Sequence, residues 1–392
     1  MAQAGTARLS PVLRTILILL LTGIVLLFPV TLPTGAGDMD LQAYWGSAYL
    51  FAHGQDFSDA EALGEAQRTL ANRTRSDTQY AWFSPIGNVI LLPFTLIPFT
   101  RLVYYWLILN VVVFFYSAVL TWEQADKRIW IPLAAVFGFA LTVISLVFGQ
   151  INSLEVLGLA LFLSLGRSKR HYLAGGSLVL TTIKPHLVIL TLPILFLDLL
   201  RKREWKTLAG FSIALGFCVA VLFAFYPPWI QSSWNVVASG MNTVRETPNL
   251  NGLLVLVGEF TLGKLLWLFA LAAGIVWWWR RGQNWDRRAF IDISVTVGLI
   301  VSPIGWSYDQ VMLIFPILSL LAWAARGELP KRDSRIVVWG LILANLAAYV
   351  LRTFTPSDVW FFWVPFVVLG SYLFARRRVN NLEPGNLSRR LE

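Results

Sequence analysis

Two carboxylates, Asp38 and Asp40, follow directly after the first long apolar stretch of the sequence. Tyr44 and Trp45 come about one helical turn later, and a helix beginning near Asp40 would place Asp40 and Tyr44 on one face. A carboxylate can take the proton from an attacking hydroxyl group. Carboxylates held beside aromatic rings at a membrane surface favour sugar chemistry, with Asp40 as general base. A solvated loop acid or a helix N-cap is the structural alternative.

Other polar side chains end or interrupt apolar stretches further along the chain. Ionisable groups at membrane depth are costly and mark functional candidates. Each also has a structural interpretation: a lysine can extend to the interface, amides can join helices, and an aspartate can cap a helix. The candidates for substrate binding are Asp38, Tyr44, Trp45, Gln150, Asn152, Lys184, His186, Arg245, Asn249, Asn251, Trp306, Tyr308 and Asp309.

The composition is that of a membrane protein with many spans. Of the 392 residues, 56% are hydrophobic and 14% are charged, whereas soluble domains carry about one quarter charged residues. The net charge of +10 does not indicate a nucleic-acid partner, because the basic residues form short clusters between apolar stretches, as in cytoplasmic loops. The single cysteine, Cys218, excludes a disulfide within the chain.

Apolar stretches long enough to cross a bilayer predict an all-α fold with about 10–12 transmembrane helices. Shorter apolar pieces at 86–99, 172–184 and 186–200 are bounded or interrupted by prolines. One short piece, 86–99 or one within 172–200, is expected not to cross, since otherwise the later basic clusters would change sides. The candidate spans are 13–32, 102–121, 129–148, 151–165, 208–226, 260–279, 289–303, 310–325, 336–352 and 359–375.

Five basic clusters predict which side of the membrane each loop faces. They place both termini in the cytoplasm and two large loops, 33–85 and 227–251, outside. Residues 1–380 form one integral membrane domain, with 33–85 as the outer catalytic loop and 381–392 as a cytoplasmic tail. The first apolar stretch is read as an uncleaved helix. The clusters are Arg167–Arg170, Arg201–Lys206, Arg280–Arg288, Arg326–Arg335 and Arg376–Arg378.

The sequence contains neither a glycine-rich dinucleotide fingerprint nor a phosphate-binding P-loop. An activated sugar would therefore arrive through the membrane on a lipid. The order of short motifs resembles glycosyltransferase family 87, whose members use polyprenyl-phosphate sugars and have the GT-C membrane fold. The resemblance covers about residues 13–325. It rests on Asp40-Leu41-Gln42-Ala43-Tyr44-Trp45 with Gly54 and Phe57, Phe83-Ser84-Pro85, Leu92-Pro93, Gly149-Gln150-Ile151-Asn152, Lys184-Pro185-His186 and Ser302-Pro303-Ile304-Gly305-Trp306.

The resemblance implies transfer of a hexose, mannose before others, to a lipid or glycan acceptor on the outer face of the cytoplasmic membrane. It implies an inverting reaction with the first-loop aspartate as base. Lys184 and Arg245 would serve the donor phosphate, and Tyr308 or Asp309 stands where related enzymes carry histidine. No cofactor is expected, and a divalent metal at Asp38 and Asp40 is the weaker alternative. The rival functions are another lipid-linked glycan ligase or polymerase, and a sugar-lipid transporter without catalysis.

Overall fold

The computed structural model describes residues 40–122, 128–241, 247–281 and 286–382. Within these ranges every regular element is helical, which confirms the all-α fold. The predicted span 13–32, Asp38, Arg245 and most of the C-terminal tail lie outside the described residues. The longer helices are α5 (Phe99–Trp122), α8 (Asn152–Arg167), α11 (Trp205–Phe225), α14 (Leu262–Arg281), α15 (Arg287–Val301), α16 (Ile314–Arg326), α17 (Lys331–Phe354) and α18 (Trp363–Leu382).

Six helical segments of the described chain are long and apolar enough to cross a membrane. A seventh is added if α6 (Trp130–Gly138) and α7 (Ala140–Val147), bent by 61° at Phe139, form one span. The predicted spans 151–165 and 289–303 are helices as expected, but α8 and α15 have 16 and 15 residues and are largely enclosed by other helices. The described bundle therefore combines long outer helices with shorter inner ones.

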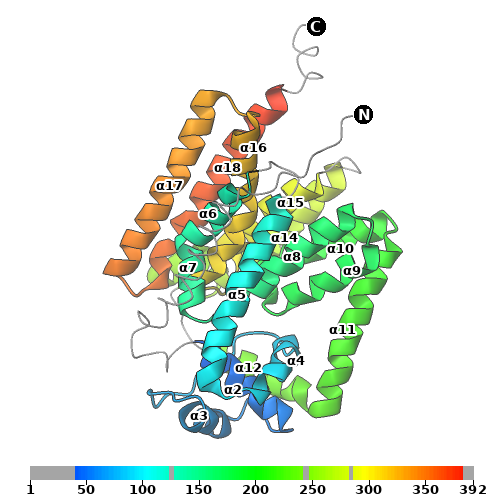
Figure 1. Cartoon of the computed structure of the whole chain (residues 1–392), viewed down its shortest axis with the longest axis vertical. Coiled ribbons are helices and arrows are strands. Elements are labelled where there is room, and N and C mark those ends of the chain that lie inside the picture. The colour runs from blue at the N-terminus through cyan, green and yellow to red at the C-terminus, as the bar shows by residue number, and fades with distance from the viewer. Residues whose placement is uncertain (1–39, 123–127, 242–246, 282–285, 383–392) are drawn as a thin grey trace, which may run out of the picture.

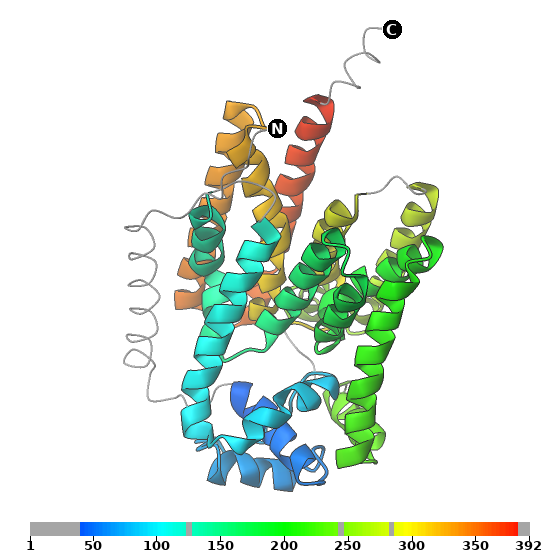
Figure 2. The same ribbon diagram turned by 45° about the vertical axis from the view of Figure 1, so that its right-hand side comes forward.

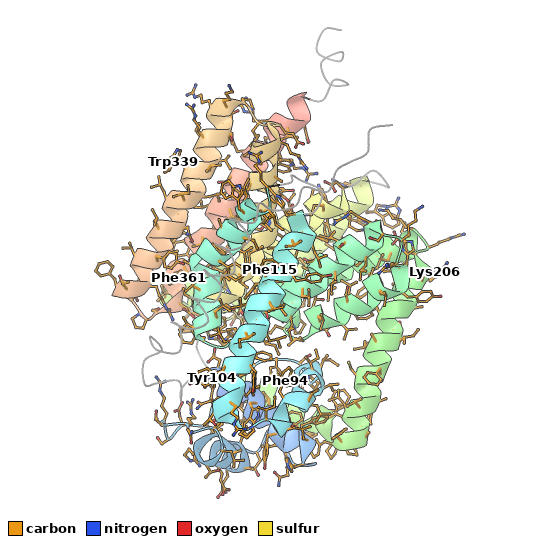
Figure 3. The ribbon with its side chains drawn as sticks, in the orientation of Figure 1. Phe94, Tyr104, Phe115, Lys206, Trp339 and Phe361 are labelled. Atoms are coloured by element: carbon orange, nitrogen blue, oxygen red, sulfur yellow. The ribbon has the colours of Figure 1, made fainter. Side chains whose placement is uncertain are left out.

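The outer helices present their apolar side chains outward. On α17, Trp339 and Leu343 are about 60% exposed, and Figure 3 shows Trp339 projecting away from the bundle. Phe361, in the short helix η6 (Asp358–Phe361), is fully buried. An exposed apolar helix face of this length is expected in lipid, where it costs nothing. The protein is therefore a multi-pass membrane protein.

The short apolar pieces fold as two different structures, a short helical segment and a helical hairpin. Residues 86–96 form α4 (Ile86–Leu91) and η2 (Leu92–Leu96), roughly 20 Å of helix, too short for a hydrocarbon core of about 30 Å. Residues 171–201 form a hairpin: α9 (His171–Ser177) and η3 (Leu178–Thr182) lead to Lys184, and η4 (Pro185–Val188) and α10 (Thr191–Arg201) lead back. The expectation that one short piece, 86–99 or one within 172–200, does not cross is compatible with either of them.

The alternating direction of the helices gathers the five basic clusters at one end of the bundle. Helices α5, α8 and α16 end there, and α11, α15 and α17 begin there; this end faces upward in Figure 1. The other end is closed by α2 (Asp40–Ala52), α3 (Ala60–Thr69), α4 and α12 (Trp229–Met241), with α13 (Leu250–Leu256) following. Figure 2 shows the same separation from a second side.

Helix α2 is the centre of this cap, because ten of its thirteen residues are buried. Gln42 donates to the carbonyl of Ala71 at 2.7 Å, and Ser47 donates to the Asn88 side chain at 3.0 Å. The backbone N–H of Asp40 donates to the carbonyl of Phe148 at 3.1 Å, across to the end of α7. The first residue of α2 is thereby fixed against the membrane bundle.

Candidate active site

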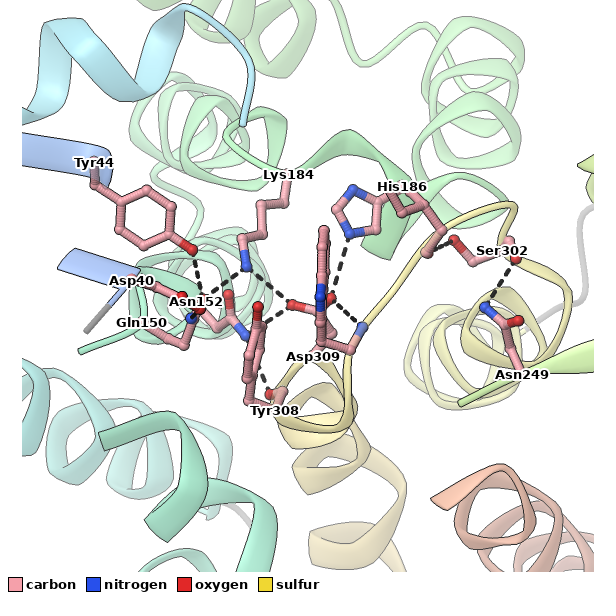
Figure 4. Close-up of polar contacts among 12 residues, drawn as sticks. Asp40, Tyr44, Gln150, Asn152, Lys184, His186, Asn249, Ser302, Tyr308 and Asp309 are labelled. Carbon is pink, nitrogen blue, oxygen red and sulfur yellow. Dashed lines mark hydrogen bonds and ion pairs between the residues drawn. The ribbon is translucent and has the colours of Figure 1, made fainter. Parts of the chain in front are cut away.

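Asp40 lies where the cap meets the bundle, and its carboxylate accepts hydrogen bonds from both sides. From the cap, the Gln79 amide donates to Oδ1 at 2.5 Å. From the bundle, the Gln150 amide donates to Oδ2. Two amide donors from distant parts of the chain therefore orient one carboxylate, and Figure 4 shows Asp40 beside Gln150.

Gln150 connects Asp40 to the charged centre of the bundle. Its amide oxygen accepts from the Tyr44 hydroxyl at 2.6 Å and from Lys184 Nζ at 2.9 Å. The side chain is positioned by a tight turn between α7 and α8, where Gly149 has φ of +64°, a conformation that glycine adopts without strain. The Trp106 indole holds the Gly149 carbonyl at 2.9 Å.

Lys184 and Asp309 form a buried ion pair behind Gln150. Lys184 Nζ lies 3.0 Å from Asp309 Oδ1, and both side chains are only 1% exposed. The Asn152 amide donates to the same oxygen at 3.0 Å, and the backbone N–H of Trp306 donates to Oδ2 at 2.9 Å. His186 Nε2 is 3.5 Å from Oδ2. Buried charges need this degree of pairing to be tolerated.

Lys184 lies at the tip of the 171–201 hairpin, which positions it in the site. Pro185 occupies the first turn of η4, where its missing N–H costs nothing, and keeps Lys184 out of the helical conformation, with ψ of 78°. The ammonium group lies 5.0 Å from the centre of the Tyr308 ring and 5.9 Å from those of Tyr44 and Trp306. The Lys184 ammonium group is therefore surrounded partly by the oxygens of Gln150 and Asp309 and partly by aromatic rings.

The segment before Asp309 is held by two amides of the α13 region. Asn249 donates to the Ser302 carbonyl at 3.0 Å, and Asn251 donates to the Pro303 carbonyl at 2.9 Å. The rings of Trp306 and Tyr308 then stack at 5.9 Å with an interplanar angle of 12°. Asn249 and Asn251 therefore position the loop that carries the aromatic residues.

A cavity of about 380 Å³ opens beside Asp40. Side chains of the cap form one wall, and the stacked aromatic pair forms part of the other. The volume is in the range of small-ligand sites. The residues lining it are Asp40, Ala43, Tyr44, Asp77, Thr78, Gln79, Tyr80, Trp82, Ser239, Trp306 and Tyr308.

The surroundings of Asp40 adjust its acidity. Burial raises the pKa of Asp40 above its ordinary value of 3.8, while the Tyr308 hydroxyl and the charge of Lys184 oppose that rise. Burial, together with the nearby Asp40 charge, raises the pKa of Tyr44 well above its ordinary value, so Tyr44 remains a neutral donor. A carboxylate with a raised pKa and fixed donors is suited to accept a proton.

The structure brings together nine of the sequence-predicted residues: Asp40, Tyr44, Gln150, Asn152, Lys184, His186, Trp306, Tyr308 and Asp309. Trp45 lies apart from these nine. It is 3% exposed, donates to the Phe94 carbonyl at 3.3 Å, packs against Tyr49 and does not line the cavity. Neighbouring residues on a helix differ by about 100° in direction, so Tyr44 and Trp45 have different surroundings, and a binding role for Trp45 stays a prediction.

Sequence reasoning missed Gln79, Arg73 and Glu155. Arg73 Nη1 donates to Gln79 Oε1 at 2.9 Å, so a chain of donors leads from Arg73 through Gln79 to Asp40. Glu155, one turn beyond Asn152 on α8, is fully buried, and its carboxylate faces the charges of Lys184 and Asp309. An acid inside the apolar span 151–165 was a signal available in the sequence. Nothing local indicated Gln79.

The described residues contain no group of three or more His, Cys, Asp or Glu side chains arranged to hold a metal ion. Asp38 lies outside those residues, so the Asp38–Asp40 metal hypothesis and the expectation of no cofactor both stay predictions. In the described part of the site, the positive charge that could face an anionic donor comes from Lys184.

The fold and the site define the class: a multi-pass, all-α membrane protein with a polar, aromatic-lined cavity where its helical cap meets the bundle. The profile of glycosyltransferase family 87 matches residues 82–303, more than half of the chain. The protein therefore belongs to glycosyltransferase family 87. No solved structure matches the chain significantly.

Three curated relatives extend this result. The chain is 27% identical over 266 residues to an alpha-(1->3)-arabinofuranosyltransferase of Mycolicibacterium smegmatis, covering 60% of this chain and 58% of the relative. It is 26% identical over 407 residues to a polyprenol-phosphate-mannose-dependent alpha-(1-2)-phosphatidylinositol pentamannoside mannosyltransferase of the same organism, covering 92% and 86%. A related phosphatidylinositol mannoside mannosyltransferase of Mycobacterium tuberculosis is 27% identical over 191 residues, covering 43% of this chain and 40% of the relative.

Proposed function

We propose that the protein is a membrane glycosyltransferase that moves a sugar, mannose before others, from a polyprenyl-phosphate donor to a lipid or glycan acceptor. The observation that carries the proposal is the Asp40 carboxylate, oriented by two amide donors at the edge of an aromatic-lined cavity. Two mannosyltransferase relatives, named for polyprenol-phosphate-mannose dependence, support the donor. The arabinofuranosyltransferase makes a furanosyl donor the alternative sugar.

In the proposed reaction an acceptor hydroxyl attacks the anomeric carbon of the donor sugar. A new carbon–oxygen bond forms as the bond from that carbon to the phosphate oxygen breaks. The hydroxyl proton passes to Asp40, and polyprenyl phosphate leaves with the bonding electron pair. A single displacement of this kind inverts the anomeric configuration and needs one carboxylate rather than the pair used by retaining glycosidases.

The surrounding residues have distinct roles in this proposal. Gln79 and Gln150 hold the two oxygens of Asp40 so that a lone pair faces the cavity. Tyr308 lines the cavity with Asp40 and, with Trp306, offers an aromatic wall for the sugar. Lys184 supplies positive charge near the leaving phosphate, since oriented charge stabilises a developing anion.

The proposed role of Lys184 depends on how its charge reaches the donor phosphate. Lys184 does not line the cavity and is held by Gln150 and Asp309. A donor phosphate in the cavity would therefore interact with the Lys184 charge across the Tyr44 and Tyr308 side chains. Alternatively, the phosphate would displace the Gln150 side chain and contact Lys184 directly. We place the active site on the outer face of the cytoplasmic membrane, because the basic clusters lie at the opposite end of the bundle.

Transfer of radiolabelled mannose from polyprenyl-phosphate mannose to extracted membrane glycolipid, by purified protein in detergent, tests the proposal. Asp40→Asn should lower turnover by about 10²-fold or more, a typical general-base effect. Glu65→Gln, an exposed acid on α3 of the same cap, is the matched control and should be silent. Full activity of folded Asp40→Asn would refute the base assignment.

The transporter and polymerase alternatives give different results in the same experiment. A transporter would move the sugar lipid across liposomes without releasing polyprenyl phosphate. A polymerase or ligase would transfer a glycan longer than one sugar. Neither result would be compatible with single-sugar transfer that depends on Asp40.

A further inference from the structure

A second cavity, of about 510 Å³, lies at the basic end of the bundle. Helix α8 connects the two sites: Asn152 stands in the candidate active site and Arg167 lines the second cavity. These positions are about 23 Å apart along the helix axis. Helix α15 likewise runs between the Ser302 loop and the cavity residue Arg287. The second cavity is therefore separate from the candidate active site.

Four arginines line this cavity: Arg167, Arg287, Arg288 and Arg326. The guanidinium group has a planar fork of donors that matches phosphate oxygens. Arg167 and Arg326 come from the C-terminal ends of α8 and α16, and Arg287 and Arg288 come from the first turn of α15. Three chain segments that are distant in sequence thus bring four guanidinium groups to one space.

Carboxylates offset part of this charge and fix the inner arginines. Arg287 Nη2 lies 3.0 Å from Asp198 and 2.6 Å from Glu204, and Arg288 Nε lies 3.0 Å from the buried Asp292. Asp286 and Asp292 also line the cavity. These pairs explain how the arginines are held, but they leave other donors facing the cavity.

Three donors on the wall make no hydrogen bond of ordinary geometry within the part of the chain that the structure describes. They are Arg287 Nε, the Thr121 hydroxyl and the Tyr372 hydroxyl. Tyr372 is 1% exposed, and its hydroxyl lies near the Asp292 carboxylate without a hydrogen bond of ordinary geometry to it. Buried donors are almost always satisfied in native structures. All three line the same cavity, so they indicate a ligand with acceptor oxygens.

The remaining wall is apolar and includes Phe162, Leu163, Leu318 and Trp323. A small inorganic ion alone would leave this surface uncovered, whereas a lipid offers both acceptor oxygens and an apolar part. The cavity also lies at the end of the bundle where the arginine distribution predicts the membrane surface.

We propose that this cavity is a binding site for a phosphoryl group carried by a membrane lipid, independent of the transferase site. The arginines and the unpartnered donors bind the phosphate oxygens, and the apolar wall contacts the glycerol or the start of an acyl chain. The proposal does not depend on the sugar, the acceptor or the role of Asp40.

Native mass spectrometry and thermal unfolding of the delipidated full-length protein test this site with three probes. The probes are phosphatidic acid, diacylglycerol with the same acyl chains, and inorganic phosphate. We expect one phosphatidic acid to bind saturably and to raise Tm, and diacylglycerol to have little effect. If inorganic phosphate gives the whole effect at the same residues, the phosphoryl site stands and its source is the free ion. Absence of saturable binding by both phosphate probes would overturn the proposal.

Two sets of variants assign the binding to this cavity. The double change Arg167→Gln and Arg326→Gln should weaken phosphatidic acid binding at least about 10-fold, and Tyr372→Phe by about 5-fold, as expected for lost bonds to an anion. Arg335→Gln and Tyr349→Phe, which change exposed residues of α17 outside the cavity, should bind as the unchanged protein does. Tyr372→Phe and Thr121→Val keep nearly the same shape, so they report on binding even if the double variant folds poorly. Equal binding in Tyr372→Phe, Thr121→Val and the controls would refute the assignment.

Discussion

Replacing Lys184 with methionine would leave the Asp309 carboxylate buried without its main countercharge. Removing one partner of a buried pair typically costs about 3–5 kcal/mol of folding free energy. Asp309 would keep the Asn152 amide at 3.0 Å, the Trp306 N–H at 2.9 Å and His186 at 3.5 Å. We therefore expect a loss of folding free energy near the lower end of this range, about 3 kcal/mol. A lysine that only extends to the membrane interface could be replaced without such a loss.

The matched measurement is unfolding of the detergent-solubilised protein by heat or denaturant, followed through tryptophan fluorescence. The double variant Lys184→Met with Asp309→Asn removes both charges, so it should recover a large part of the lost stability. Wild-type stability in the single variant would show that the pair contributes little. A double variant no more stable than the single one would show that lost packing, not an uncompensated charge, explains the loss.

The same variants test the proposed role of Lys184 toward the donor. If its charge faces the leaving phosphate, the double variant should remain folded yet show reduced turnover and weaker use of the polyprenyl-phosphate donor at low concentration. Arg128→Gln, at the far end of the bundle, is a suitable control for loss of a positive charge. Unchanged donor dependence in the folded double variant would reduce Lys184 to a structural residue.

Three further predictions concern the pH profile, Tyr308 and the orientation. Burial raises the pKa of Asp40 above 3.8 and catalysis needs its ionised form, so turnover should rise with pH through that raised pKa, and a rate that is flat from pH 4 to 8 would contradict this. Tyr308→Phe removes a hydroxyl that favours the charged form of Asp40 and should lower turnover by about 10-fold. Tyr308→His should add a transition between about pH 6 and 7. If neither change affects turnover, the residue is structural. A cysteine at position 61, in the exposed first turn of α3, should react with an impermeant reagent in intact cells, and reaction only after permeabilisation would invert the proposed orientation.

The sequence predicted the scaffold well because its signals are local. A bilayer requires long apolar helices with satisfied backbones, and these leave a clear pattern in composition. The sides of the basic clusters predicted that one short piece, 86–99 or one within 172–200, does not cross, and α4 with η2 is short enough to be that piece. The helices of 151–165 and 289–303 were also found, although their short length and burial depended on the neighbours that enclose them.

Site residues were predictable where a charge interrupts an apolar stretch. Lys184 and Asp309 stood out because an isolated charge at that depth must have a partner. The sequence could not indicate that they pair with each other, since 125 positions separate them. Pairing of this kind depends on how the 171–201 hairpin packs against η5 (Ser307–Leu313).

What the sequence determined by itself is the membrane class, the helices and the residue types available for chemistry, since each follows from composition or from periodicity along one segment. Only the tertiary structure decided that Tyr44 faces the cavity while Trp45 packs against Phe94, and that Gln79 reaches Asp40. The physical reason is rotation. Helical periodicity fixes the angle between successive side chains, but packing against distant segments sets which of those directions meets the site.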